Sequence, residues 1–135
     1  MPKPPIVADL VWIGDLTFSA TIDRASTIID SAGVAGPSPV QALAAALAGC
    51  MSVDVAHILT KGRHPLGALH AHLVGERAQE DPHRFQRIAL HFAVAGGVPA
   101  EAVERAIALS REKYCSVWHS MRQDIDFVVT FDVSA

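Results

Sequence analysis

Two cysteines, Cys50 and Cys115, are the residues of this chain best suited to chemistry. A thiolate that attacks the O–O bond of a peroxide becomes a sulfenic acid, and a second thiol can condense with that acid to form a disulfide. Such a cycle requires the two Cα atoms to come within the roughly 4.4–6.8 Å that a disulfide spans. On the residues alone, the other interpretation is that both cysteines are small apolar side chains of the core.

Polar residues close to the cysteines offer further chemistry. Asp54 and His57 follow Cys50 by four and seven residues, so the three can share one helix face, where a histidine base could assist the thiol. The alternative is that the helix simply becomes polar as it enters solvent. His119 follows Cys115 by four residues, but the spacing of these Cys and His residues matches no compact zinc motif, and we expect neither a metal nor another cofactor.

The helix that must hold Cys50 begins clearly. Ser38 is a typical N-cap, Pro39 suits the first helical position, and Gln41 can complete a capping box. The pattern predicts a helix to about Lys61, and its alanine-rich first half should pack against a sheet, another helix and a second copy of the chain. The apolar stretch from residue 40 to residue 50 is shorter than the roughly 20 residues that span a bilayer, which favours a core helix.

The remaining elements follow from alternating and helical patterns of apolar residues. We expect an α+β fold with the order β-β-β-α-β-β-α-α-β, in one domain over residues 1–135. The expected strands cover residues 7–13, 18–23, 26–30, 66–77, 84–95 and 125–133. A second helix should begin at Pro99, bury a stripe of Val103, Ala106, Ile107 and Ser110, and end or bend near Cys115 before a short third helix.

Composition and charge restrict the classes of binding partner that we expect. The chain has 135 residues, of which 50% are hydrophobic and 19% charged, and its net charge is -3. Because no basic run is present, we expect neither a nucleic acid nor a membrane surface as partner. No N-terminal segment has the pattern of a signal peptide, so we expect a cytoplasmic protein, in which a disulfide would be transient.

Two motifs resemble one known superfamily. The segment Ser38-Pro39 with the run from Leu43 to Cys50, and the later Glu112-Lys-Tyr-Cys-Ser-Val117, resemble the osmotically inducible protein C (OsmC) and organic hydroperoxide resistance (Ohr) superfamily, and its less characterised OsmC-like branch most. The resemblance implies antiparallel sheets around a long buried central helix in an intertwined homodimer. It also implies a peroxidatic Cys50, a resolving Cys115, organic hydroperoxides as substrates in oxidative stress defence, and a dithiol reductant.

One position departs from the family pattern. In the well-studied members, a glutamate after the helix-opening proline holds an arginine over the reactive thiol. This chain has Val40 at that position and Gln41 at the next, where related branches carry glutamate. The resemblance makes Arg24 the best candidate for the arginine. Alternatively, Arg24 is an exposed residue at a strand end and Gln41 only caps the helix.

These inferences lead to two hypotheses about function. The first is thiol-dependent reduction of organic hydroperoxides, with an apolar substrate pocket near Leu47, Val117 and Trp118 and with Gln41 at its edge. The second is a dimer without catalytic activity that binds a small apolar or thiol-containing ligand in the same pocket. Loss of the family glutamate motivates the second hypothesis.

Overall fold

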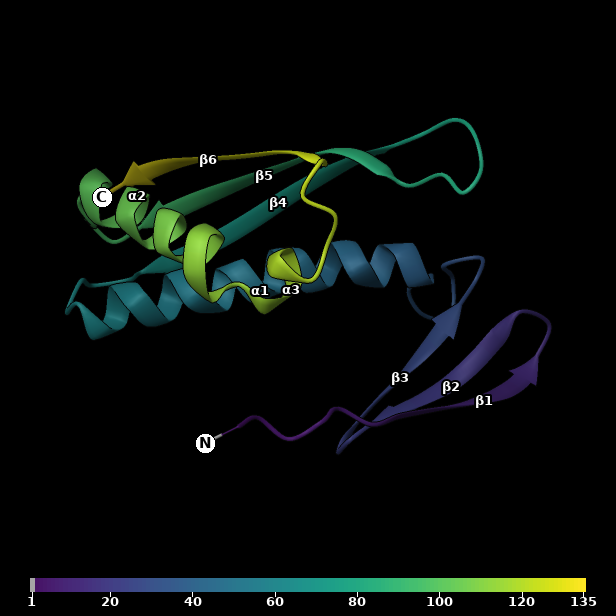
Figure 1. Cartoon of the computed structure of the whole chain (residues 1–135). Helices are drawn as coiled ribbons and strands as arrows, with labels where there is room; N and C mark the ends of the chain where they lie inside the picture. The colour runs from purple at the N-terminus through teal and green to yellow at the C-terminus, as the bar shows by residue number, and fades with distance from the viewer. Residues whose placement is uncertain (1) are drawn as a thin grey trace. The chain divides into compact units, whose positions relative to one another are not determined.

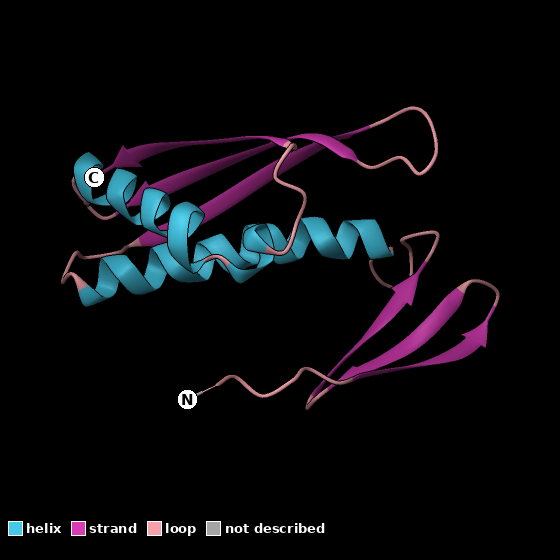
Figure 2. Cartoon of the chain, viewed as in Figure 1, coloured by secondary structure: helices cyan, strands magenta, loops and turns pink. Residues whose placement is uncertain are grey.

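The computed structural model describes residues 2–135, which form two compact units. The first unit ends at Leu43, and the second comprises Ala44–Ala135. The elements follow the predicted order along the chain, as the colouring in Figure 1 shows, and Figure 2 distinguishes the helices from the strands. The α+β class is therefore confirmed, whereas the assignment of a single domain stays a prediction.

The first unit is an antiparallel meander of the three strands expected at the start of the chain. It contains β1 (Ala8–Gly14), β2 (Thr17–Ile22) and β3 (Ala25–Asp30), with β2 in the centre of the sheet. Asp15 and Asp23 lie in the turns with φ of 46° and 53°, a conformation that aspartate tolerates better than most residues. These tight turns make each strand pair with its neighbour in sequence.

Asp30 organises the loop that leads from this sheet to the first helix. Its buried carboxylate accepts hydrogen bonds from the N–H groups of Ala32, Val34 and Ala35 and from the Thr17 hydroxyl. These bonds, that of the Ala35 N–H most of all, hold the pKa of the Asp30 carboxyl below its usual value. The loop is thus fixed by one side chain rather than by a sheet ladder.

The first helix, α1 (Pro39–Lys61), begins with the predicted capping box. The Ser38 Oγ accepts from the Gln41 N–H at 3.2 Å, and the Gln41 Oε1 accepts from the Ser38 N–H at 2.9 Å. The carboxamide of Gln41 is therefore committed to the cap. At the other end Arg63 adopts a left-handed φ of 62°, and the N–H groups of Arg63 and His64 donate to the carbonyl oxygens of Thr60 and Leu59, each at 3.0 Å. This Schellman motif ends the helix after Lys61, where the sequence predicted.

One face of α1 is buried, by residues that recur every four positions: Leu47, Met51, Val55 and Leu59. The other side, which includes Ala46, Gly49 and Val53, is exposed in the described chain. The expected burial all round the helix is thus absent within one copy of the chain. By length and composition alone α1 could cross a membrane, a test that core helices also pass.

The second sheet has the strand order β4-β5-β6 and contains β4 (Ala68–Arg77), β5 (Phe85–Ala95) and β6 (Asp126–Ser134). β4 and β5 pair antiparallel, as predicted, but β5 and β6 pair parallel, which corrects the expectation of antiparallel sheets. The physical reason is the long connection between β5 and β6, because parallel neighbours need a crossover. That crossover carries Cys115.

The two faces of this sheet differ in polarity. Alternate residues of β5 point inward and are buried, including Leu90 and Phe92. The opposite face carries His91, whose ring nitrogens hydrogen-bond to Thr130 and Asp132 of β6, each at 2.8 Å. His72 pairs with His91 in register on this outer face, which is therefore a polar surface.

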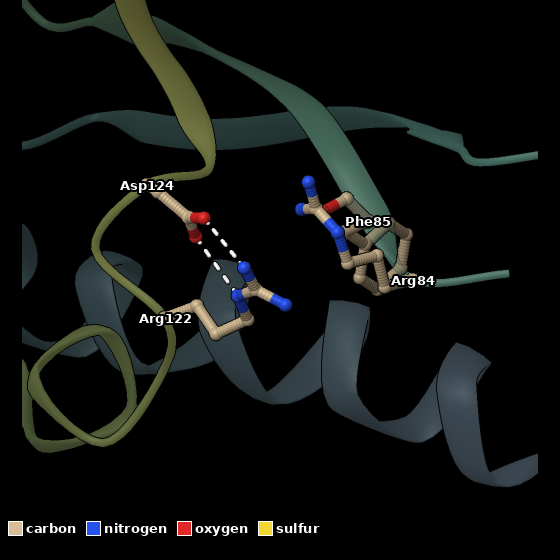
Figure 3. A network of polar contacts seen from close by, with 4 residues as sticks. All are labelled: Arg84, Phe85, Arg122 and Asp124. Carbon is tan, nitrogen blue, oxygen red and sulfur yellow. Dashed lines mark hydrogen bonds and ion pairs between the residues drawn. The ribbon is translucent and has the colours of Figure 1, made fainter. Parts of the chain in front are cut away.

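The crossover contains α2 (Ala100–Leu109), a π-helical turn η1 (Ser110–Tyr114) and a short helix α3 (Ser116–His119). The predicted stripe of α2 is buried, Ser110 included. After α3 the chain enters β6 through a loop fixed by Arg122, which donates two hydrogen bonds to the Asp124 carboxylate, with Arg84 on the facing side (Figure 3). Both arginines lower the pKa of the Asp124 carboxyl, Arg122 most.

Candidate thiol site

The structure brings Cys50 and Cys115 together. Cys50 is half-buried on α1, and Cys115 is fully buried where η1 ends. Burial raises the pKa of the Cys115 thiol to about 11, and the interaction with the neighbouring Cys50 thiol contributes to the rise. The two thiols therefore influence each other directly, and both are free in this structure.

Backbone groups fix the position of the Cys115 sulfur. The Cys115 N–H donates to the Ser110 carbonyl oxygen at 2.8 Å, which is the hydrogen bond that closes the π turn. The Cys115 Sγ accepts from the Trp118 N–H at 3.4 Å. This N–H and that of Val117 act against the effect of burial on the Cys115 pKa. Single π turns occur frequently at functional sites, and this one holds the buried thiol against α1.

A side-chain hydrogen bond also joins η1 to α1. The Ser110 Oγ donates to the Asp54 Oδ2 at 2.7 Å, and Ser110 itself is fully buried. We predicted that Asp54 shares a helix face with Cys50 and that Ser110 lies in a buried stripe, but not that the two meet. A hydroxyl within an apolar stripe needs a hydrogen-bond partner, and this signal could have suggested the contact.

The proposed pocket residues of the second unit lie in or beside its core. Leu47 and Trp118 are buried, and Val117 is half-buried. The Trp118 ring packs on Phe127 with centroids 4.6 Å apart, and the Arg111 guanidinium lies over both rings. The sequence analysis did not single out Arg111. The substrate pocket itself stays a prediction.

The remaining predicted site residues are not joined to the thiols by any described contact. Arg24 is exposed in the turn between β2 and β3, Gln41 is engaged in the capping box, and His57 is exposed on α1. His119 directs its Nε2 to the Arg111 carbonyl oxygen at 3.0 Å. Residues 2–135 contain no cluster of three or more His, Cys, Asp or Glu side chains arranged to hold a metal.

Comparison with known proteins adds independent information. Residues 30–130 match the family model of the OsmC-like proteins. Protein YhfA of Escherichia coli (strain K12) is 35% identical over 131 residues, which cover 95% of this chain and 98% of YhfA.

Solved structures show the same fold. A hypothetical protein from Aquifex aeolicus VF5 superposes with a TM-score of 0.90 at 26% identity over 98% of each chain. An organic hydroperoxide resistance protein OsmC from Legionella pneumophila has a TM-score of 0.73 at 17% identity, over 98% of this chain and 100% of that one. The family match spans both cysteines and agrees with the resemblance of their flanking motifs, so this chain belongs to the OsmC-like family.

Proposed function

We propose that this protein reduces organic hydroperoxides through Cys50 and Cys115. The observation that carries the proposal is the direct interaction of a half-buried thiol with a fully buried one. A peroxide can reach the more exposed Cys50 first, and Cys115 then lies within reach to resolve the product. The similarity of fold to a protein named for organic hydroperoxide resistance supports the same activity.

The chemistry balances with two thiols and one external dithiol. The Cys50 thiolate attacks the terminal oxygen of the hydroperoxide and the O–O bond breaks. The alkoxide takes up from the solvent the proton that the thiol had released, and it leaves as the alcohol. The resulting sulfenic acid condenses with the Cys115 thiol, so that an S–S bond forms and water leaves. A dithiol then reduces the disulfide by two successive exchanges and is itself oxidised to a disulfide.

The raised pKa of Cys115 suits a resolving role. With a pKa of about 11, this thiol is protonated at neutral pH and does not compete with Cys50 for peroxide. Part of the rise comes from the neighbouring Cys50, through a hydrogen bond between the two side chains and through the repulsion between two thiolates. Once Cys50 is a neutral sulfenic acid this repulsion is gone, and Cys115 loses its proton more readily when the disulfide forms.

The finer assignments follow the family resemblance. In our proposal Arg24 favours the thiolate of Cys50, and an apolar pocket near Leu47, Val117 and Trp118 favours organic peroxides over hydrogen peroxide. A reducing compartment such as the cytoplasm fits the use of a transient disulfide.

We also propose a homodimer that covers the exposed side of α1. Ala46, Gly49 and Val53 lie along this side at spacings of three and four residues, and small residues allow close approach of another backbone. In the first unit Trp12 of β1 is likewise exposed, at 64%. Apolar surface on this scale is typical of an interaction site.

Steady-state turnover tests the proposed activity. Wild-type protein with dithiothreitol should consume cumene hydroperoxide faster than hydrogen peroxide, and Cys50→Ser should abolish the consumption. Wild-type protein that consumes neither peroxide would contradict the proposal. Saturable binding of an apolar ligand by such an inactive protein would instead support the non-catalytic hypothesis.

A further inference from the structure

Asp54 and Ser110 form a connection between the two thiols that the proposed function does not use. Asp54 lies one turn after Cys50 on α1, and its carboxylate accepts the Ser110 hydroxyl at 2.7 Å. Ser110 also accepts the Cys115 N–H on its backbone carbonyl at 2.8 Å. One residue therefore bonds both to the helix that carries Cys50 and to Cys115 itself.

The burial of Ser110 gives this connection its stiffness. The residue is fully buried, so its hydroxyl has no access to bulk water as an alternative partner. A hydrogen bond to a charged acceptor is also stronger than one between neutral groups. The hydrogen bond crosses from η1 to α1 between residues that are 56 positions apart, and it is the kind of contact that sets the distance between two elements.

We propose that Asp54 and Ser110 are positioning residues that hold Cys115 within disulfide reach of Cys50. The inference rests on the proposed function, because the affected step is the condensation of the Cys50 sulfenic acid with the Cys115 thiol. In that step the S–O bond breaks, the S–S bond forms, and the thiol proton leaves with the hydroxyl as water. The first step, attack on peroxide, uses the Cys50 thiol and not Cys115, so it does not depend on the hydrogen bond between Asp54 and Ser110, which we call the tether.

The test separates the two steps in rapid-mixing experiments with cumene hydroperoxide. Ser110→Ala should leave formation of the sulfenic acid, trapped with dimedone, unchanged. It should slow disulfide formation by about tenfold, as expected for loss of a hydrogen bond to a charged group. Asp54→Ala should behave in the same way. Asp54→Asn should recover most of the rate, because its carbonyl oxygen can still accept the Ser110 hydroxyl.

Ser52→Ala is the matched control. Ser52 is also half-buried on α1, but its hydroxyl donates within the helix, to the Ala48 carbonyl oxygen at 2.6 Å. This variant should form the disulfide at the wild-type rate. Disulfide formation in Ser110→Ala at the wild-type rate, or equal slowing in Ser52→Ala, overturns the proposal.

The reduction potential of the cysteine pair, measured by equilibration with glutathione, tests the tether without peroxide. If loss of the tether slows closure of the disulfide tenfold and leaves its opening unchanged, the equilibrium constant falls tenfold, and the reduction potential of the pair is about 30 mV less negative in Ser110→Ala than in the wild type. If the wild type forms the disulfide with oxidised glutathione but not with hydroperoxide, the proposed function fails while the tether is still tested. An unchanged potential in both Ser110→Ala and Asp54→Ala contradicts the tether whatever the activity.

Discussion

At the scale of single residues, the two cysteines differ in their surroundings rather than in their chemistry. Cys115 is fully buried and has a pKa of about 11, and Cys50 is half-buried beside it. Burial favours the neutral thiol of Cys115, and the adjacent Cys50 adds to this effect. In our proposal, the more exposed thiol attacks the peroxide and the buried thiol resolves the product.

Removal of Cys50 should lower the pKa of Cys115. In Cys50→Ser the contribution of the neighbouring thiol is lost while burial, the largest cause, remains. We expect the midpoint to fall below about 11 but to stay above the ordinary value of 9.0. Titration followed by the NMR shift of a ¹³C label at the cysteine Cβ measures it directly. A midpoint at or below 9.0 in the wild type would mean that burial does not govern this thiol.

The sequence predicted the cysteine pair because each thiol lies in a recognisable motif of the superfamily. It did not predict the hydrogen bond between Asp54 and Ser110, since no local pattern links residues so far apart. Gln41 shows the opposite case, because its cap depends only on neighbours in sequence. The role of Arg24 stays a prediction.

At the scale of elements, Asp30 connects the first sheet to α1. The pKa of its carboxyl is lower in the folded state than the ordinary value of 3.8. The stabilisation is thus fully present above about pH 4 and is lost as the pH falls through the lowered pKa. The change of stability with pH that Asp30 causes should therefore be confined to acidic conditions.

Asp30→Asn should therefore lower the melting temperature at pH 7 by about a few degrees and weaken its dependence on pH below 4. The reason is that an amide has one acceptor oxygen, while the carboxylate uses both of its oxygens. Thermal denaturation at pH 7 and pH 2.5 measures both effects. Asp9→Asn, at an exposed site of β1, is the control. Identical pH profiles for Asp30→Asn and the wild type would refute this account of the loop.

The order of elements was predictable because caps, turns and alternation are local signals. Two features of the crossover between β5 and β6 could not be predicted from these local signals. The parallel pairing of β5 with β6 depends on where the crossover returns the chain, and alternation of apolar residues is the same for both pairing directions. The π turn at Ser110–Tyr114 begins at a residue that hydrogen-bonds to Asp54 of α1, a partner 56 positions away, whereas the sequence predicted only that the helix ends or bends there.

At the scale of the whole molecule, the proposed dimer accounts for the uncovered side of α1. Val53 lies on this side and is 68% exposed in one copy of the chain. A carboxylate there would become a buried, unpaired charge when a second copy packs on the helix.

We expect Val53→Asp to raise the dimer dissociation constant by at least about tenfold, which corresponds to about 1.4 kcal/mol. Sedimentation equilibrium measures the constant. Val74→Asp is the matched control, because Val74 is 51% exposed on the polar outer face of the second sheet. A wild-type protein that stays monomeric, or a Val53→Asp protein that dimerises as tightly as the wild type, would disprove the proposed interface.

The central claim is that Cys50 and Cys115 form one redox pair, and the most direct measurement is the number of free thiols after oxidation. One equivalent of cumene hydroperoxide added to the reduced protein should remove both thiols and lower the intact mass by two hydrogens. Cys115→Ser should stop at a sulfenic acid or oxidise further, and Cys50→Ser should keep its thiol. Survival of both thiols in the wild-type protein would contradict the account.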